Sequence, residues 1–380
     1  MKKGWTYKKL GEVCEIISGQ SPDGKYYNTD GIGTPFYQGK KDFTLKYIGE
    51  PTMWTTNETK IAEKDDLLMS VRAPVGDVNF ATQRLCIGRG LAAIRTKGIV
   101  DKDFLFFFLL GKKNIIKGKE GVGFASINRK EIMDIDIQYP KDYSEQQRIV
   151  SRLDSAFANI DALKANAEKQ LTEARALFQK ALAKAMEPKE GWKEMPLNKV
   201  SSYSIGLTYK PSDVSESGTI VLRSSNIQNE KLDLSDLVRV KCPIKESLYA
   251  QEGDILMCSR NGSAKLVGKV AVIPKLTERV TYGTFMMIIH SVYNPYLFYF
   301  FQSESFRKQI KHGEANMINQ ITRYMLDDVL VNVPQITEME GIVSRLDSLS
   351  ENIKKLEEIL RKTIAECDAL KQAMLRKVFE

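Results

Sequence analysis

The heptapeptide IVSRLDS occurs at residues 149–155 and again, unchanged, at residues 342–348, which is 193 residues later. The same spacing relates the flanking residues without a gap, from 144–186 in the first copy to 337–379 in the second. Seven identical residues in one register are not a chance match, so both segments descend from one ancestor. This internal repeat organises the whole chain.

The repeat extends beyond these two segments. Gly4 and Trp5 reappear as Gly191 and Trp192, and DLLMSVR at residues 66–72 matches DILMCSR at residues 254–260. The chain therefore consists of two copies of a globular segment followed by a long helix. We predict four parts: a first domain over residues 1–143, a first helix over 144–190, a second domain over 191–336 and a second helix over 337–380.

Both helical segments carry apolar or small residues at alternating steps of four and three, which predicts a coiled-coil seam. In the first copy the seam is predicted at positions 149, 153, 156, 160, 163, 167, 170, 174, 177, 181 and 184, and in the second at the equivalent positions. A helix of about 43 residues is about 65 Å long. An antiparallel pair would return the second helix to the first domain.

The composition of the two seams suggests how the helices pair. Small residues of the first seam match large residues of the second if Ala167 meets Leu356, Ala174 meets Leu349, and Ala181 meets Ile342. Four apolar residues fall outside the predicted seam and are expected on the outward helix faces, where partner subunits could bind: Phe157, Phe178, Ile359 and Val378.

The globular segments mix helical and strand patterns. Residues 135–139 alternate like a strand, whereas the apolar runs at 104–110 and 296–309 are typical of buried helices. The predicted fold is therefore α+β, with two related globular domains separated by a long antiparallel two-helix coiled coil and a pseudo-two-fold internal repeat.

Composition indicates an ordinary soluble chain, because 43% of its 380 residues are hydrophobic and 27% are charged. The start, MKKGWTYKKL, lacks the apolar core of a signal peptide, and the run at 104–110 is too short to cross a bilayer. We expect a cytoplasmic protein with no membrane contact. The net charge of +8 lies mainly on the two globular segments, which favours a polyanionic partner.

Several motifs suggest chemistry, but each has a simpler structural explanation. The stretch Gly19 to Lys25 fits the phosphate-binding pattern G-x-x-x-x-G-K, yet Tyr26 stands where Ser or Thr is needed and Pro-Asp-Gly spells a turn. Asn294-Pro-Tyr lacks the second proline of the N-P-P-Y/F tetrapeptide of DNA amino-methyltransferases, so it is expected to start a buried helix. We predict no catalytic residue and no metal ligand, and we interpret as structural or surface groups Asp134, Asp136, His290 and His312.

Polar and basic clusters recur in corresponding loops of the two domains. Gln38, Lys40 and Lys41 occupy the places of Arg223, Ser225 and Asn226. Arg, Gln, Asn and Lys read base edges, and Ser and Lys often hold phosphates, so these residues are candidates for DNA contact. A second group of candidates shares this chemistry: Arg72, Arg89, Asn128 and Arg129 in the first domain, and Lys210, Arg260, Asn261, Lys265, Asn319 and Arg323 in the second.

The tandem arrangement, the paired Gly-Trp starts, the LLMSVR and ILMCSR strands and the paired IVSRLDS helices together resemble the specificity subunits of Type I restriction-modification systems. The resemblance covers the whole chain. It implies two target-recognition domains, each reading one half of a split, asymmetric site in double-stranded DNA. It also implies a non-catalytic chain with two modification (methyltransferase) subunits and restriction (ATP-dependent translocase and nuclease) subunits as partners. S-adenosylmethionine, ATP and Mg²⁺ would then be used by those partners, with no cofactor in this chain.

Two other classes stay open at this point. A single-chain DNA methyltransferase would need a glycine-rich cofactor loop and a complete tetrapeptide, neither of which occurs in this sequence. A coiled-coil scaffold with no role in DNA binding would account for the helices but not for two divergent basic domains.

Overall fold

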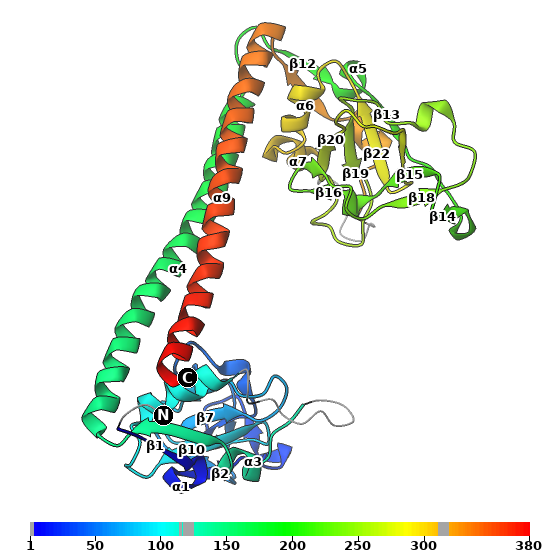
Figure 1. The fold of residues 1–380 in the computed structure, drawn as a ribbon. Coiled ribbons are helices and arrows are strands. Elements are labelled where there is room, and N and C mark those ends of the chain that lie inside the picture. The colour runs from blue at the N-terminus through cyan, green and yellow to red at the C-terminus, as the bar shows by residue number, and fades with distance from the viewer. Residues whose placement is uncertain (1–3, 114–115, 117–124, 311–318) are drawn as a thin grey trace. The chain divides into compact units, whose positions relative to one another are not determined.

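The computed structural model describes residues 4–113, 116, 125–310 and 319–380, and it divides into two compact units (Figure 1). The first unit contains Met1–Glu168 and Arg361–Glu380, and the second contains Lys169–Leu360. Each unit therefore combines one globular domain with parts of both long helices. His312 lies outside the described residues. No helix among the described residues is long and apolar enough to span a bilayer.

The first domain is built on three sheets. The strands of the antiparallel pair are β1 (Trp5–Lys9) and β11 (Asp136–Pro140), which confirms the predicted strand near 135–139. A four-stranded sheet has the order β2 (Cys14–Ser18), β10 (Leu91–Thr96), β7 (Leu67–Ser70), β8 (Val78–Phe80). A five-stranded sheet has the order β3 (Tyr27–Asn28), β5 (Trp54–Thr55), β4 (Thr34–Tyr37), β9 (Leu85–Ile87), β6 (Ile61–Ala62). The helical segments are α1 (Leu10–Val13), η1 (Gly24–Tyr26), η2 (Lys40–Asp42), α2 (Lys102–Lys112) and α3 (Arg129–Met133).

The second domain repeats this plan. Its antiparallel pair is β12 (Lys193–Pro196) with β23 (Leu330–Val333), and its central sheet has the order β13 (Ser202–Ile205), β22 (Met286–His290), β19 (Ile255–Cys258), β20 (Val270–Val272). The other sheets are β14 (Val214–Ser215), β18 (Val238–Val240), β15 (Thr219–Leu222), β21 (Val280–Tyr282), and the pair β16 (Ile227–Gln228), β17 (Lys231–Leu232). The helical segments are α5 (Leu197–Val200), η3 (Pro211–Asp213), η4 (Ser224–Asn226), η5 (Glu246–Leu248), α6 (Asn294–Phe300), α7 (Glu304–Ile310) and α8 (Arg323–Asp327).

Apolar helices cover the central sheets, as the runs at 104–110 and 296–309 predict. Phe104 to Leu109 of α2 are buried in the core of the first domain. The second run is not one helix, however, because it is divided into α6 and α7. Ser303 lies between them and caps the start of α7, since its hydroxyl accepts a hydrogen bond from the N–H of Phe306 at 3.2 Å. The repeated tryptophans lie in equivalent places, with Trp5 against Phe104 and Trp192 against Tyr296.

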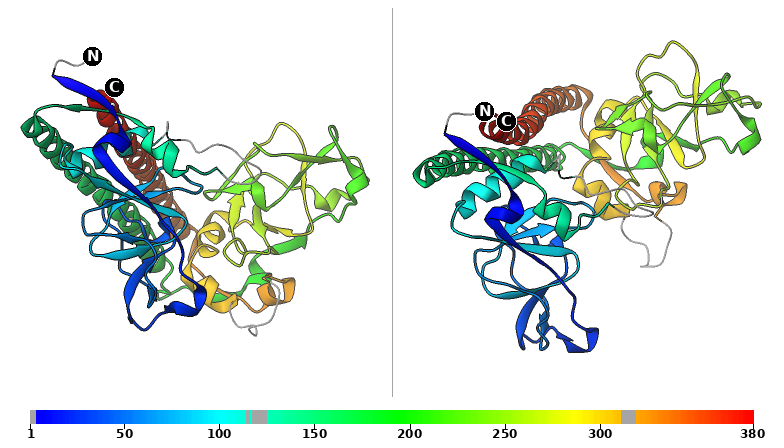
Figure 2. Two further views of the ribbon diagram at one scale, coloured as in Figure 1. Left: turned by 90° about the horizontal axis from the view of Figure 1, so that it is seen from below. Right: turned by 60° about the horizontal axis from the view of Figure 1, so that its bottom comes forward.

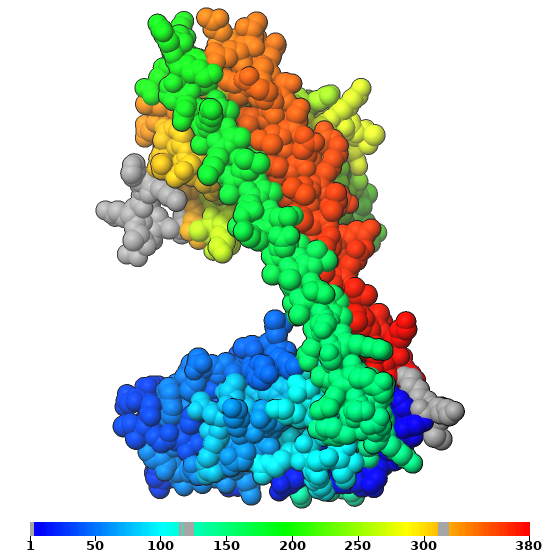
Figure 3. All heavy atoms as spheres, turned by 90° about the vertical axis from the view of Figure 1, so that its left-hand side faces the viewer, coloured from blue at the N-terminus to red at the C-terminus, as the bar shows by residue number. Residues whose placement is uncertain are grey.

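The two long helices are α4 (Tyr143–Ala185) and α9 (Ile336–Phe379), and they run side by side in opposite directions (Figure 3). In the first unit Lys164 pairs with Asp368 at 2.8 Å, and Asp161 pairs with Lys371. In the second unit Arg175 pairs with Glu357 at 2.7 Å. The partner number falls as the α4 number rises, so the predicted antiparallel pairing is confirmed.

The predicted seam is only half right. Four predicted seam positions of α4 that are seven residues apart are buried, namely Leu153, Ile160, Ala167 and Ala174. The seam positions that lie between these are not buried. Four leucines at such positions on the two helices are 41–57% exposed, namely Leu163, Leu177, Leu356 and Leu370. The buried face of each helix is therefore rotated away from the predicted seam. The globular domains cause this rotation because they pack against the other flank of each helix, where Phe157 meets Phe107 edge-on and Phe178 approaches Tyr299. The prediction that Phe157, Phe178 and Val378 face outward is therefore wrong, since all three pack against domain cores.

The predicted register of the helix pair is also wrong. Leu356 lies beside Ala174 and Leu177, with which it lines one shallow hollow. The sequence-based pairing instead matched Ala174 with Leu349. The predicted register assumed that the seam positions of the two helices face each other, so that small residues meet large ones. Both helices are rotated from that seam, and the assumption therefore does not hold.

The end of α9 completes the core of the first domain. Leu375 and Phe379 are buried there, and the Phe379 ring meets the rings of Phe104 and Phe108 edge-on at 5.4 and 5.6 Å. Both views of Figure 2 show the start of β1 and the end of α9 close together in this unit. In the second domain the equivalent residues of α4, Leu182 and Met186, belong to the core in the same way.

Candidate nucleic-acid interface

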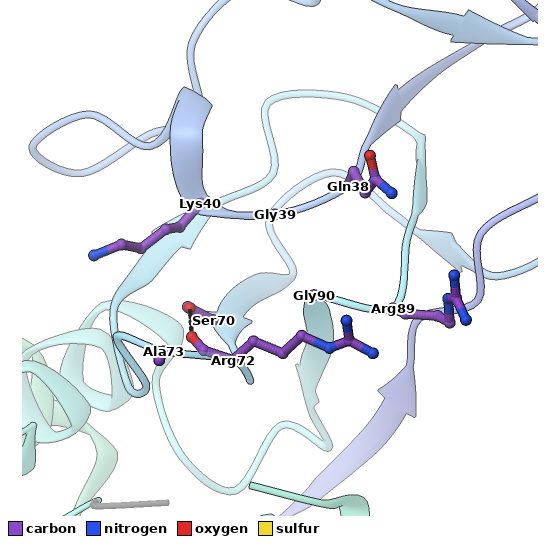
Figure 4. Close-up of a pocket in the computed structure, with 8 residues that line it drawn as sticks. All are labelled: Gln38, Gly39, Lys40, Ser70, Arg72, Ala73, Arg89 and Gly90. Carbon is purple, nitrogen blue, oxygen red and sulfur yellow. Dashed lines mark hydrogen bonds between the residues drawn. The ribbon is translucent and has the colours of Figure 1, made fainter. Parts of the chain in front are cut away.

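Four of the predicted contact residues come together in the first domain. Gln38, Lys40, Arg72 and Arg89 line one open hollow of about 260 Å³, together with Gly39, Ser70, Ala73 and Gly90. They come from the loops that follow β4 and β7 and precede β10. Figure 4 shows the Arg72 side chain extending toward the side where Arg89 and Gln38 lie, whereas Lys40 points the opposite way.

Backbone hydrogen bonds fix these three loops against one another. The Gly88 N–H donates to the Tyr37 carbonyl at 2.8 Å, and the Gly90 N–H donates to the Gln38 carbonyl at 3.1 Å. The Val71 N–H donates in turn to the Gly90 carbonyl at 3.0 Å. The backbones that carry Gln38, Arg72 and Arg89 are thus held at fixed spacing before any ligand binds.

The basic residues that line this hollow differ in whether they form ion pairs within the protein. Lys40 forms an ion pair with Asp77, which also binds Lys113. Burial raises the pKa of Asp77, but the two ammonium groups outweigh this effect and lower the pKa below its ordinary value. Among the described residues, by contrast, no carboxylate pairs with the guanidinium of Arg72 or Arg89. These two groups are the ones available to an anionic or hydrogen-bond-accepting ligand.

The remaining candidates of the first domain do not line the hollow. Lys41 is exposed in η2. Asn128 caps α3, where its side-chain oxygen accepts from the N–H of Glu131 at 3.0 Å. Arg129 opens the same helix, and its Nε donates to the carbonyl of Ile16 at 2.9 Å.

The second domain places its candidates on the same framework. The Gly283 N–H donates to the Leu222 carbonyl at 2.9 Å, as Gly88 does to Tyr37, so Arg223 stands where the first domain has Gln38. The Ser259 N–H donates to the Phe285 carbonyl at 3.0 Å, as Val71 does to Gly90. Arg260 therefore stands in the place of Arg72, as the matching strands predict.

Several side chains of the second domain are used within the protein. Asn226 is only 1% exposed, and its amide is consumed by the Arg223 N–H and by the carbonyls of Asp233 and Asp236. Its prediction as a DNA contact is wrong for that reason, whereas its neighbour Ser225 is exposed. Arg223 itself pairs with Asp236 at 2.8 Å, which neutralises part of its charge.

The other candidates of this domain divide into fixed and exposed groups. Asn261 donates to the Ser224 hydroxyl at 3.2 Å, and Asn319 donates to the Gly262 carbonyl at 3.2 Å, so both shape the loop of Arg260. Arg323 opens α8 after the capping residue Thr322, at the position that Arg129 has in α3. Two lysines are exposed outside this group, Lys210 and Lys265.

Sequence reasoning missed Phe285, because the search considered only polar and basic side chains. The Phe285 ring lies 5.4 Å from the Arg260 guanidinium carbon, and the residue is 54% exposed. Phe285 lies two residues after Gly283, just as Gly90 lies two residues after Gly88. This shared spacing could have identified Phe285 as part of the interface.

The motifs that could have indicated nucleotide binding, methyl transfer or metal binding have structural roles instead. Gly24 to Tyr26 form the turn η1, and the Lys25 ammonium lies over the Tyr26 ring. Asn294 starts α6 as predicted, and its amide donates to the carbonyls of Gly253 and Ile289. Asp136 pairs with Lys9 at 2.6 Å, whereas Asp134 ends α3 and does not share the strand. His290 forms a 2.7 Å contact with Asp254, at the place where Arg95 pairs with Asp66 in the first domain.

The chain thus consists of two copies of one α+β domain with basic and amide-bearing loops, each joined to a long helix. A family model described as the Type I restriction modification DNA specificity domain matches residues 2–173 and again 189–365. The chain therefore belongs to this family.

Curated relatives agree with this assignment. A protein of Methanocaldococcus jannaschii, provisionally named the specificity subunit of the type I restriction enzyme MjaX, is 39% identical over 179 residues, which cover 45% of this chain and 40% of that protein. The EcoKI specificity subunit of Escherichia coli K12 is 30% identical over 169 residues, 42% of this chain and 36% of the subunit. These matches span about two fifths of the length of the curated relatives.

The fold of the whole chain is found among solved structures. A chain from a study of complex assembly and conformational transition of the type I R-M system aligns over 100% of this chain and 98% of its own length, with a TM-score of 0.82 and 18% identity. The HsdS subunit of Thermoanaerobacter tengcongensis aligns over 100% and 97%, with a TM-score of 0.57 and 18% identity.

Proposed function

We propose that this chain is the non-catalytic DNA-recognition subunit of a type I restriction-modification complex, and that each globular domain reads one half of a bipartite, asymmetric duplex site. The observation that carries the proposal is the pair of equivalent loop frameworks. Both domains hold the same loops and share two of the backbone hydrogen bonds that connect them, but they present different side chains, Gln38 and Arg89 in one and Arg223 and Phe285 in the other. One scaffold with two sets of reading residues suits a site whose halves differ.

Selection of bound duplexes from a random-sequence pool tests this proposal. The complex of the full chain with its modification subunit should select two short half-sites separated by a fixed spacer. Arg72→Ala should relax the first half-site only, because a bidentate arginine contact is worth about 1–3 kcal/mol of discrimination. The matched control is Arg84→Ala, since Arg84 is already paired with Glu58 and Glu63. Absence of any consensus, or a change in both half-sites with Arg72→Ala, would contradict the proposal.

The partners of the chain are part of the same proposal. The exposed leucines of the two long helices form one set per unit, with Leu163 and Leu370 in the first unit and Leu177 and Leu356 in the second. The 193-residue repeat relates the two sets, because Leu163 corresponds to Leu356 and Leu177 to Leu370. Two equivalent apolar sets fit two copies of one partner, so we assign them to two modification subunits, to which restriction subunits are added.

Charged substitutions at one set test the partner assignment. Leu177→Glu with Leu356→Glu should leave one modification subunit bound per chain instead of two, as measured by the mass of the purified complex. Leu45→Glu is the control, because Leu45 is 78% exposed but belongs to a loop of the first domain. Two bound subunits in the double variant would remove these leucines from the interface.

In this proposal the chain supplies binding and no bond-making step. S-adenosylmethionine would be held by the modification subunits, and ATP and Mg²⁺ by the restriction subunits. The isolated chain should accordingly show no saturable binding of S-adenosylmethionine by calorimetry.

A further inference from the structure

Phe285 is a large apolar side chain of the second domain that lies in the candidate interface and is half exposed. It directly precedes β22, and its carbonyl accepts hydrogen bonds from the N–H groups of Ser259 and Arg260 at 3.0 and 3.1 Å. These bonds tie the Phe285 backbone to the loop that carries Arg260. The position of the ring relative to Arg260 is therefore set by the framework.

The ring contacts the arginine through its face. The Arg260 guanidinium carbon lies 5.4 Å from the ring centroid, within the range of a cation–π contact. Among the described residues no carboxylate pairs with Arg260, so the ring is the group that restrains it. A guanidinium that stacks on a ring keeps its N–H groups directed outward in the plane of the fork, free to donate to a ligand.

At the equivalent position the first domain carries no ring and has no space for one. Gly90 occupies the place of Phe285, and a Cβ added there would lie 2.5 Å from the Gln38 carbonyl oxygen. The residue before it is Arg89, whereas the second domain has Thr284. At these equivalent positions the first domain presents Arg72 and Arg89 in a hollow, whereas the second presents Arg260 over the Phe285 ring.

We infer that Phe285 is a positioning residue which holds Arg260 for bidentate recognition of one guanine in the half-site of the second domain. The inference rests on the proposed function and names a determinant of its specificity. Arginine is the side chain whose fork matches the O6 and N7 acceptors of guanine in the major groove. Restraining the guanidinium before binding lowers the entropic cost of that contact and favours guanine over the other bases.

The test uses the full chain in complex with its modification subunit and the bipartite duplex selected by that wild-type complex. Each guanine of the second half-site is replaced in turn by 7-deazaguanine, which lacks the N7 acceptor. One replacement should weaken binding by the wild type by roughly tenfold or more. The same replacement should have no effect on Arg260→Ala and a clearly smaller effect on Phe285→Ala.

Conservative variants separate the aromatic face from simple bulk. Phe285→Tyr keeps the ring and should restore wild-type sensitivity to the replacement, whereas Phe285→Leu fills space without a π face and should behave like Phe285→Ala. Unchanged discrimination at the first half-site in every variant shows that the complexes are folded.

Two outcomes would overturn the inference alone: a second half-site that contains no guanine sensitive to Arg260, or full wild-type sensitivity in Phe285→Ala. A wild-type complex that selects no consensus would instead overturn the proposed function, and the inference with it.

Discussion

Gly19 has no room for a side chain. A Cβ at this position would lie 2.2 Å from the Gly88 carbonyl oxygen and 2.7 Å from that of Leu91, and at Gly206, the equivalent residue of the second domain, it would lie 2.2 Å from the Tyr282 carbonyl. Gly24, the other glycine of the same G-x-x-x-x-G-K pattern, has no atom within 4 Å of such a Cβ. Close backbone approach in both domains thus explains the first glycine without any phosphate ligand.

Alanine substitutions distinguish packing from phosphate binding. Gly19→Ala should destabilise the first unit by about 1–3 kcal/mol, because backbone must move to admit the methyl group. Gly24→Ala should change stability by less than about 0.5 kcal/mol. Urea unfolding of the full chain measures both. Equal losses in the two variants would mean that the overlap at Gly19 does not set its role.

The ion pairs of Asp77 predict that the stability of the folded chain depends on pH. Because the folded chain lowers the pKa of this carboxyl from 3.8, its contribution to stability is present above that value and is lost as the pH falls through the lower, folded pKa. Asp77→Asn should therefore be less stable than the wild type by about 0.5–1 kcal/mol near pH 7, and the two should converge at a strongly acidic pH that lies below the folded pKa. The check is urea unfolding at both pH values. A difference that persists in acid would point to lost packing instead of lost ion pairs.

The sequence located the loops of the candidate interface but not the direction of each side chain. Ser225 and Asn226 are neighbours in one polar cluster, yet one is exposed and the other is buried by three hydrogen bonds. Composition identifies an amide as able to donate and accept, but only the path of the surrounding chain decides whether those bonds are made internally. Phe285 escaped notice because an apolar residue next to a strand resembles core.

The long helices show the limit of periodicity at the scale of elements. On α4 the central positions Ile160 and Ala167 have apolar neighbours on both flanks, with Leu163 on one side and Phe157 and Leu171 on the other. A repeat of seven residues fits either flank, so the sequence predicts the helices and their antiparallel pairing without deciding which flank is buried. Packing of Phe157 and Phe178 against the domains decides it.

A pair of substitutions on α9 tests how the helix attaches to the first domain. Phe379→Ala should destabilise the first unit by about 3–5 kcal/mol, because it leaves a cavity between the rings of Phe104 and Phe108. Leu370→Ala, on the same helix but half exposed, should cost less than about 1 kcal/mol. Thermal unfolding followed by calorimetry gives both values. A small loss for Phe379→Ala would show that the helix end is not part of the core.

At the scale of the whole molecule, the repeat makes the two helix ends interchangeable. Leu182 and Met186 of α4 complete the core of the second domain, and their counterparts Leu375 and Phe379 of α9 complete that of the first. A helix from a second copy of the first half of the chain could therefore fill the place of α9.

A fragment of residues 1–190 should accordingly form a two-fold symmetric homodimer. With the modification subunit it should direct methylation to an interrupted palindrome built from the first half-site, in contrast to the asymmetric site that we propose for the full chain. Its stability should be lower, because Met186 replaces the larger Phe379 in the core. Sedimentation equilibrium and sequencing of methylated DNA are the measurements. Methylation at an asymmetric sequence would contradict the model of one domain per half-site.

The attachment of Phe379 also fixes the order in which the domains can be completed during synthesis. The ribosome produces the strands of the first domain early, but Leu375 and Phe379 follow more than 200 residues later, after roughly 10–50 s at the usual rate of translation. Until then the rings of Phe104 and Phe108 lack their contacts with Phe379 in the nascent chain. The second domain has no such delay, because Leu182 and Met186 emerge before it. The domain that is made first should therefore be the one that finishes folding last.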